Sequence, residues 1–308
     1  MPRVRDRIDQ NKLFKVVRGL KSRLGRLAVP LHRCRRSNHI FTQHQLLVLL
    51  VLRQWSGKSY REFCVLVEVC TALLKELGLR RLPHFTTLQK FAQRVQQALL
   101  DRLLGSFADL VDGPLHLAID STGFSCTSAS RYFCTVVQRN EERTLAKGQR
   151  SLRRHLKQSM AIDTSNQMIL AVRYRYGPYN DAPDAIPVLE AVASIGKVAV
   201  VVADKGYDSK HIRRYIWYAM KAESHIPLRR TSKHGQEDMN ILRRKQKDVF
   251  DERKYHRRAL IETVHSVEKR VMRQDVLATS TSCQHKELTL RAIAYDSRRA
   301  VMMGNDFY

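Results

Sequence analysis

Four residues near the C-terminus combine a phenol, two cations and a carboxylate. Counted from the first of them, the others follow after three, seven and fourteen residues: Tyr255, Arg258, Glu262 and Lys269. At about 100° per helical residue, these intervals return all four side chains to one stripe roughly 60° wide. Such a stripe can hold a divalent metal ion against a phosphodiester, because its cations neutralise phosphate oxygens. Ordinary ion pairing on a basic amphipathic helix is the alternative, and the stripe alone does not decide.

Two aspartates far upstream can complete a carboxylate site. Asp120 closes the apolar stretch LHLAID, and Asp204 closes VAVVVAD. Sites in open sheets form beyond strand ends, so the two aspartates face each other if these strands are neighbours. With Glu262 they would hold two Mg²⁺ or Mn²⁺ ions roughly 3.5–4 Å apart, since oxygen ligands suit these ions better than zinc. An aspartate after a strand is also a common turn former, and either one taken singly keeps both interpretations open.

Other aspartates have simpler explanations. Asp163 ends the stretch MAID directly before residues 164–166, Thr-Ser-Asn, where a hairpin turn accounts for it. Asp181, Asp184 and Asp208 stand at the expected starts of helices, where capping accounts for them.

Residues 41–112 have helical periodicity throughout. Thr42 is expected to cap the first helix and Ser59 the second, and Thr86 or Thr87 to cap a fourth. Short helices preceded by a basic stretch suit a helix-turn-helix-like reader of DNA. An ordinary helical bundle that only packs on the next domain explains them equally well.

After Gly113 and Pro114 the pattern changes to strands. The order is three strands, a helix, a strand, a helix, a short strand and a long C-terminal helix that starts near Asp251. This order predicts an α/β fold, a mixed sheet flanked by helices, preceded by an all-α N-terminal region. The predicted organisation is a basic N-terminal segment at 1–40, a helical DNA-binding region at 41–112 and a catalytic domain at 113–303.

Composition indicates a polyanionic partner. The 308 residues carry a formal net charge of +26, and 44% of them are hydrophobic, enough for a buried core. Nucleic acid is the natural partner for such a chain. The longest apolar stretch, 46–52, is too short to cross a bilayer, and the first residues have no apolar secretion signal, so we expect a cytoplasmic protein without membrane contact. Six cysteines without a C-x-x-C pair are expected to be reduced and mostly buried, and argue against a zinc ribbon.

The three carboxylate blocks together resemble the DDE-type transposases of the insertion-sequence 4 and 5 superfamily. The family pattern Y-x2-R-x3-E-x6-K is matched at Tyr255, Arg258, Glu262 and Lys269. The first two blocks are matched by Asp120-Ser-Thr-Gly and by Asp204-Lys-Gly-Tyr. The resemblance covers about residues 115 to 300, and three blocks in the required order are much more specific than any one of them.

The resemblance implies a ribonuclease H-like, retroviral-integrase-like catalytic domain. Asp120, Asp204 and Glu262 would then be the catalytic metal ligands, binding Mg²⁺ or Mn²⁺, with two ions expected. The expected contacts to DNA phosphates are Tyr255, Arg258, Lys269 and Lys205. The implied reaction is cleavage at the ends of a mobile element followed by strand transfer into target DNA, carried out in a prokaryotic cell, at the nucleoid, by a homodimer or larger assembly on paired ends.

Two other functions remain open on the sequence. One is a DNA-binding protein on a decayed transposase scaffold, and the other is a metal-dependent nuclease that only hydrolyses. The intact carboxylate set favours activity over decay. Some relatives form DNA hairpins with a tryptophan in a strand-rich insertion before the glutamate. Here the stretch between Asp204 and Glu262 is short, and its one tryptophan, Trp217, is expected in the core.

Overall fold

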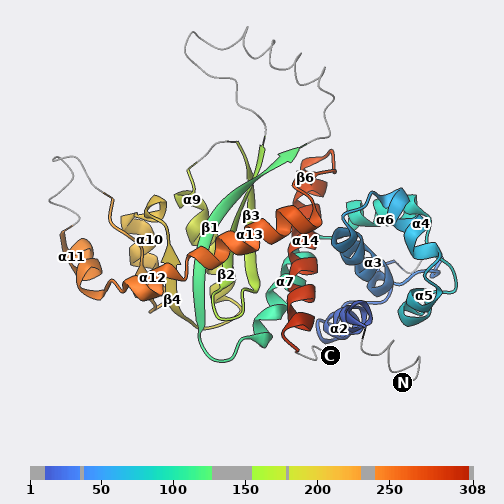
Figure 1. Cartoon of the computed structure of the whole chain (residues 1–308), viewed down its shortest axis with the longest axis horizontal. Coiled ribbons are helices and arrows are strands. Elements are labelled where there is room, and N and C mark those ends of the chain that lie inside the picture. Colours follow the sequence, from blue (N-terminus) through green and yellow to red (C-terminus); the bar gives the residue numbers. More distant parts are fainter. Residues whose placement is uncertain (1–10, 35–37, 127–154, 178–179, 230–239, 305–308) are drawn as a thin grey trace, which may run out of the picture. The chain divides into compact units, whose positions relative to one another are not determined.

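The computed structural model describes residues 11–34, 38–126, 155–177, 180–229 and 240–304 (Figure 1). The basic stretch that precedes the predicted helices, residues 33–36, lies partly outside these ranges. The chain divides into two compact units. The first unit comprises Met1–Leu110, Arg270–Arg273 and His285–Tyr308, and the second comprises Val111–Lys269 and Gln274–Gln284.

The first unit is built from helices. Its elements are α2 (Lys12–Arg26), α3 (Gln43–Ser56), α4 (Tyr60–Glu68), α5 (Thr71–Leu77), α6 (Phe85–Arg94), α7 (Gln97–Gly105), η1 (Ser106–Leu110) and most of α14 (Thr281–Met302). Two predicted helix starts are confirmed with their caps. Thr42 and Gln45 form a capping box on α3, and Ser59 and Glu62 form one on α4. These side chains satisfy the amide groups that have no partner in the first helical turn.

Two features of this unit differ from the expectation. α2 lies within residues 1–40, where only a basic segment was predicted; its apolar residues recur every three or four positions and are buried. α6 begins at Phe85, so neither Thr86 nor Thr87 is its cap. The residue at the cap position, His84, makes no cap bond, and its Nδ1 instead lies 2.8 Å from Thr86 Oγ1.

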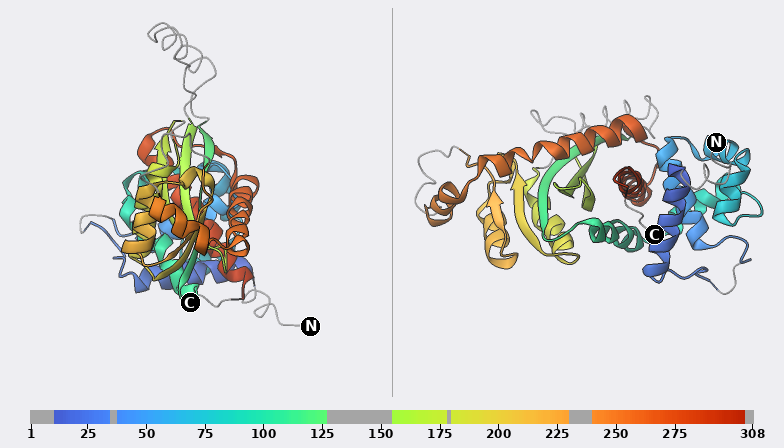
Figure 2. Two further views of the ribbon diagram at one scale, coloured as in Figure 1. Left: turned by 90° about the vertical axis from the view of Figure 1, so that its left-hand side faces the viewer. Right: turned by 60° about the horizontal axis from the view of Figure 1, so that its bottom comes forward.

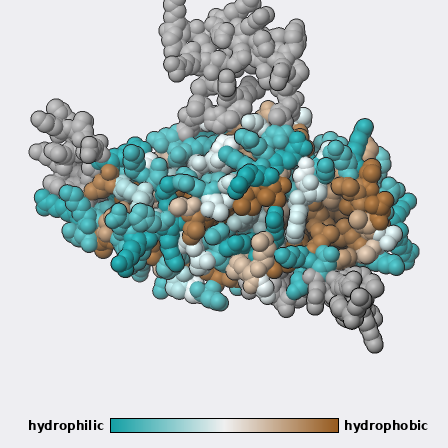
Figure 3. All heavy atoms as spheres, viewed as in Figure 1, coloured by the Kyte–Doolittle hydropathy of each residue, from teal (hydrophilic) through white to brown (hydrophobic). Residues whose placement is uncertain are grey.

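The surface is mainly hydrophilic on the face drawn in Figure 3, as expected of a chain in which 27% of residues are charged. Apolar residues gather on this face over the helices of the first unit. In that unit Val65, Leu66 and Val69 are exposed on α4 and directly after it. In the described part of the chain, no helix is long and apolar enough to cross a membrane.

The second unit contains a six-stranded mixed sheet. The strands are β1 (Leu115–Cys126), β2 (His155–Asp163), β3 (Ile169–Tyr176), β4 (Val198–Ala203), β5 (Glu223–His225) and β6 (Asp275–Val276). Their order is β3-β2-β1-β4-β5, with β6 beside the end of β1. β1, β2 and β3 are antiparallel to one another in turn, whereas β1, β4 and β5 are parallel. The predicted mixed sheet is therefore confirmed.

The hairpin between β2 and β3 is also confirmed. Asp163 at its turn is fully buried, and its carboxylate accepts hydrogen bonds from the backbone N–H groups of His116 at 2.9 Å and Ser165 at 2.8 Å. These bonds hold the backbone of the turn and of the neighbouring strand, so a structural role is sufficient for Asp163.

Helices lie on both faces of the sheet. They are α9 (Ala182–Ala193), η2 (Lys205–Tyr207), α10 (Lys210–Arg214), η3 (Tyr215–Ala219), α11 (Asn240–Val249), α12 (Glu252–His256) and α13 (Ala259–Met272). α13 crosses one face, and α9 packs against β2 and β3 on the other (Figures 1 and 2). Because side chains alternate along a strand, successive residues of β1 face these two helices in turn.

The predicted long C-terminal helix is interrupted. Asp251 caps α12 at the predicted start. α12 ends at His256, and a turn precedes α13. In this turn the N–H of Arg258 donates to the carbonyl of Tyr255, three residues back, which tightens the chain as in a 3₁₀-helix. Tyr255 and Glu262 therefore lie on two helices, and the prediction of one continuous helix face is wrong.

The aspartates predicted as caps form ion pairs instead. Asp181 stands at the N-cap position directly before α9 without a cap bond, and its carboxylate contacts Lys157. Asp184 is buried and binds Arg175 on β3. Asp208 pairs with Arg213, described below.

Trp217 is buried in η3, as predicted. The described cysteines are free thiols, which agrees with the expectation. None of these five side chains is fully buried, so the expectation of mostly buried cysteines is wrong.

Candidate active site

Asp120 and Asp204 occupy matching positions on neighbouring parallel strands. Ile119 of β1 pairs with Ala203, the last residue of β4, so Asp120 comes next on β1 and Asp204 comes directly after β4, on strands about 4.8 Å apart. β1 does not end at Asp120, as the sequence predicted, but continues to Cys126. It continues because β2 stays paired to one edge and β6 pairs with its far end. Asp120 therefore lies in mid-strand, at the level where β4 ends.

Arg258 joins Asp120 to Glu262. Its Nη2 lies 2.6 Å from Glu262 Oε1, and its Nη1 lies 3.9 Å from Asp120 Oδ2. The i,i+4 ion pair foreseen as the ordinary alternative is therefore present. Because the same guanidinium also reaches Asp120, however, the Glu262 carboxylate is turned toward β1. The Glu262 side chain is 57% exposed and that of Asp120 is 20% exposed.

A tight turn holds Asp204. Its Oδ1 accepts a hydrogen bond from the N–H of Gly206 at 2.5 Å. A Cβ on Gly206 would lie 2.6 Å from the same oxygen, so a side chain at that position would displace the Asp204 carboxylate from the turn. Arg229 braces the turn by donating to the carbonyls of Lys205 at 2.6 Å and Gly206 at 2.9 Å. Asp204, Lys205, Gly206 and Arg229 line one surface pocket together with Leu228.

A buried ion pair stabilises the turn that follows Asp204. Arg213 Nη2 donates to Asp208 Oδ1 at 2.8 Å, and both side chains are almost fully buried. The other carboxylate oxygen of Asp208 accepts from the backbone N–H of Arg229 at 2.7 Å. The chain from Arg213 through Asp208 to Arg229 therefore fixes the backbone that follows Asp204.

The other predicted DNA contacts occupy three different places. Lys269 Nζ donates to Thr122 Oγ1 at 2.6 Å, which brings it to the face of β1 that carries Asp120. Lys205 is exposed beside Asp204. The ring of Tyr255 packs against that of Phe250, with centroids 5.6 Å apart.

One comparison decides the family. A family model described as the transposase DDE domain matches residues 112–296. The chain belongs to the DDE transposase family. The chain is thus a DDE-type insertion-sequence transposase, as the three ordered blocks implied. Its mixed sheet with helices on both faces is the expected ribonuclease H-like fold, and an all-helical region precedes it. Searches among curated proteins and among solved structures give no match.

The carboxylates of this transposase repel one another. Burial raises the pKa of the Asp120 carboxyl above its ordinary value, and the negative charges of Asp204 and Glu262 add to the increase. A hydrogen bond from the Ser121 backbone and the charge of Arg258 act in the opposite direction without cancelling it. A cation at this place would relieve the repulsion.

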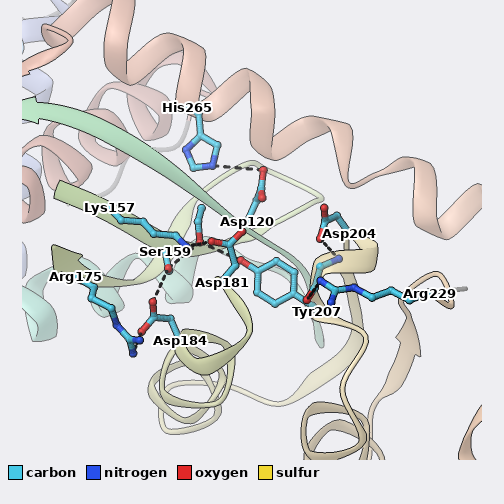
Figure 4. A network of polar contacts seen from close by, with 12 residues as sticks. Asp120, Lys157, Ser159, Arg175, Asp181, Asp184, Asp204, Tyr207, Arg229 and His265 are labelled. Carbon is cyan, nitrogen blue, oxygen red and sulfur yellow. Dashed lines mark hydrogen bonds and ion pairs between the residues drawn. The ribbon is translucent and has the colours of Figure 1, made fainter. Parts of the chain in front are cut away.

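The opposite face of β1 carries a structural network. Ser121 Oγ lies 2.8 Å from Ser159 Oγ and 3.1 Å from the hydroxyl of Tyr207. Ser159 in turn contacts the buried Asp184 of α9. Burial raises the pKa of the Tyr207 phenol, which therefore stays protonated. This network holds β1 on the face opposite Asp120, and Asp120 points toward α13 (Figure 4).

Sequence reasoning missed two side chains next to the carboxylates. His265 lies one turn after Glu262 on α13, with its Nε2 3.9 Å from Asp120 Oδ2 (Figure 4). Arg229 stands in the pocket beside Asp204. Helical spacing from Glu262 and Lys269 was the available signal for His265. Arg229 has no local signal in the sequence, because its contact joins a turn to a segment more than twenty residues away.

DDE transposases generally use divalent metal ions, and the donors here suit such an ion. Asp120, Asp204 and Glu262 offer only oxygen atoms, as Mg²⁺ and Mn²⁺ prefer. Among the described residues, no three His, Cys, Asp or Glu side chains form a ready-made metal cluster. Arg258 lies between two of the three carboxylates instead. The donor types fit, and a shared ion requires Arg258 to release Glu262.

Proposed function

We propose that this transposase cuts DNA at the ends of its element and joins the freed ends to target DNA, with Asp120, Asp204 and Glu262 as the catalytic carboxylates. The pairing of β1 with β4 carries the proposal, because it puts two aspartates at one level of the sheet. The contact of Arg258 with both Asp120 and Glu262 supports the third member.

The three carboxylates would hold Mg²⁺ or Mn²⁺, in all two ions. When bound, the ions activate the attacking oxygen and stabilise the leaving oxygen of the phosphodiester. The chain itself positions the reactants, since phosphoryl transfer depends on alignment and charge neutralisation and needs no covalent enzyme intermediate. Water attack first frees a 3′-hydroxyl, and that hydroxyl then attacks a phosphodiester of the target.

The cations around the carboxylates would bind the DNA backbone. Arg258 approaches the site from the turn before α13, and Lys269 approaches it from α13. On the side of Asp204 stand Lys205 and Arg229. Once Arg258 releases Glu262, its guanidinium can pair with phosphate oxygens in the same place. Tyr255 is the more peripheral contact, because its ring packs on Phe250.

The wider assignment follows from the same activity. We propose the organisation 1–40, 41–112 and 113–303, with the helical region as a DNA-binding part. Action on paired ends implies a homodimer or larger assembly, working at the nucleoid of a prokaryotic cell. The net charge of +26 supports tight binding to double-stranded DNA, with an affinity that falls steeply as salt rises.

Incubation with element ends tests the activity. Full-length protein and Mg²⁺ are mixed with labelled duplexes carrying the DNA that flanks the coding region on each side, together with a supercoiled target plasmid. We expect 3′-hydroxyl ends at the element boundary and labelled strands joined to the plasmid, both lost when EDTA is added.

The same assay separates the alternatives. Nicked duplexes without joined products would indicate a nuclease that only hydrolyses. Salt-sensitive binding with all strands intact would indicate a DNA-binding protein on an inactive scaffold.

A further inference from the structure

His265 is a buried polar side chain whose partner is not supplied by the described part of the chain. It is 7% exposed, and neither ring nitrogen has a hydrogen-bond partner there. Its Nε2 points at Asp120 Oδ2 from 3.9 Å (Figure 4). Leaving a buried imidazole unsatisfied beside a carboxylate is costly, so the arrangement calls for a third group.

The two groups do not satisfy each other. A separation of 3.9 Å is too long for a hydrogen bond. Both nitrogens of the buried His265 ring are therefore left without a hydrogen bond in the described part of the chain. A neutral imidazole keeps a lone pair on one nitrogen, and this is the form that binds metals. With the ring proton on Nδ1, the Nε2 lone pair and the carboxylate oxygen of Asp120 are two acceptors, and a cation between them satisfies both.

We propose that His265 binds, through Nε2, the same divalent cation as Asp120. The proposal rests on the proposed function, because it presumes an ion at Asp120. Divalent ions lie about 2.0–2.1 Å from imidazole nitrogen and about 2.0–2.6 Å from carboxylate oxygen, so two donors on one ion are separated by roughly 3–4.5 Å. The observed 3.9 Å falls within this range.

A nitrogen donor changes which ion the site prefers. Mg²⁺ favours oxygen ligands, whereas imidazole raises the affinity for transition-metal ions. With His265 as a ligand, Mn²⁺ is preferred over Mg²⁺ more strongly than by three carboxylates alone. This preference is a property of the chain that an oxygen-only site would not show.

Pulsed electron paramagnetic resonance on the full-length protein with MnCl₂ tests the ligand directly, because it detects nitrogen nuclei bonded to Mn²⁺. We expect nitrogen coupling in the wild type and its loss in His265→Gln. The matched control is His256→Gln, which removes an exposed imidazole from α12 and is expected to keep the coupling. The affinity for Mn²⁺ is expected to fall about tenfold in His265→Gln, while that for Mg²⁺ changes less.

Mn²⁺ binding and nitrogen coupling separate the role of His265 from the proposed function. Mn²⁺ binding that is lost in Asp120→Asn but shows no nitrogen coupling in the wild type overturns the role of His265 and leaves the proposed function intact. Coupling that persists in His265→Gln assigns the nitrogen to another histidine and also overturns it. If the wild type binds no Mn²⁺ even with duplex DNA present, the proposed function itself fails. His265→Phe, which fills the site without a polar atom, replaces His265→Gln if that variant does not fold.

Discussion

Asp204→Asn is expected to lower metal-dependent DNA cleavage by roughly a thousandfold while the protein stays folded. Asparagine keeps an oxygen that can accept the hydrogen bond from Gly206, so the turn after β4 is preserved. What it loses is the negative charge next to Asp120, where the ion is proposed to bind. The measurement is the initial rate of strand cleavage on labelled element ends with Mg²⁺.

The control for this variant is Asp248→Asn, which makes the same chemical change at an exposed site on α11. It is expected to cleave at the wild-type rate. Affinity for duplex DNA in EDTA should be similar for both variants and the wild type, because Asp204 acts on the reaction. A cleavage rate for Asp204→Asn within a few-fold of the wild type would remove Asp204 from the catalytic set.

Asp208→Ala is expected to destabilise the second unit by about 3–5 kcal/mol, because it removes the carboxylate that pairs with the buried guanidinium of Arg213. It also removes the acceptor for the Arg229 N–H and so loosens the turn that holds Asp204. Urea unfolding followed by circular dichroism measures the first effect. The rate of DNA cleavage at urea concentrations below the midpoint of unfolding measures the second effect.

Two further variants make this result specific. Glu252→Ala removes a carboxylate that is 80% exposed on α12, and is expected to change the free energy of unfolding by less than about 1 kcal/mol. The double change Asp208→Ala with Arg213→Met removes both charges and is expected to cost less than Asp208→Ala alone. An Asp208→Ala variant as stable as Glu252→Ala would mean that the pair does not support the turn.

Local signals made much of the fold predictable. The capping boxes at Thr42 and Ser59 depend on residues three apart, and the hairpin at Asp163 depends on a short turn, so the sequence was sufficient for each. Pairing between distant strands has no local signal in the sequence. The sequence therefore predicts that Asp120 and Asp204 face each other only if β1 and β4 are neighbours. The structure meets that condition.

The remaining differences come from tertiary contacts. β1 continues past Asp120 because β2 and β6 pair with its end. The residues after LHLAID contain no pattern that predicts this continuation. Asp208 binds Arg213 rather than capping α10, since a buried arginine outweighs a cap bond. His265 was not singled out in the sequence, because its proximity to Asp120 depends on the packing of α13 against β1. The catalytic roles of the three carboxylates stay a prediction.

The location of the metal tests the central claim most directly. Crystals of the full-length protein grown with Mn²⁺ and element-end DNA would show the ion in an anomalous difference map. We predict Mn²⁺ bonded to carboxylate oxygens of both Asp120 and Asp204, with Glu262 turned from Arg258 to the same site. Mn²⁺ bound elsewhere, with Glu262 still paired to Arg258 and no ion between the two aspartates, would contradict the account.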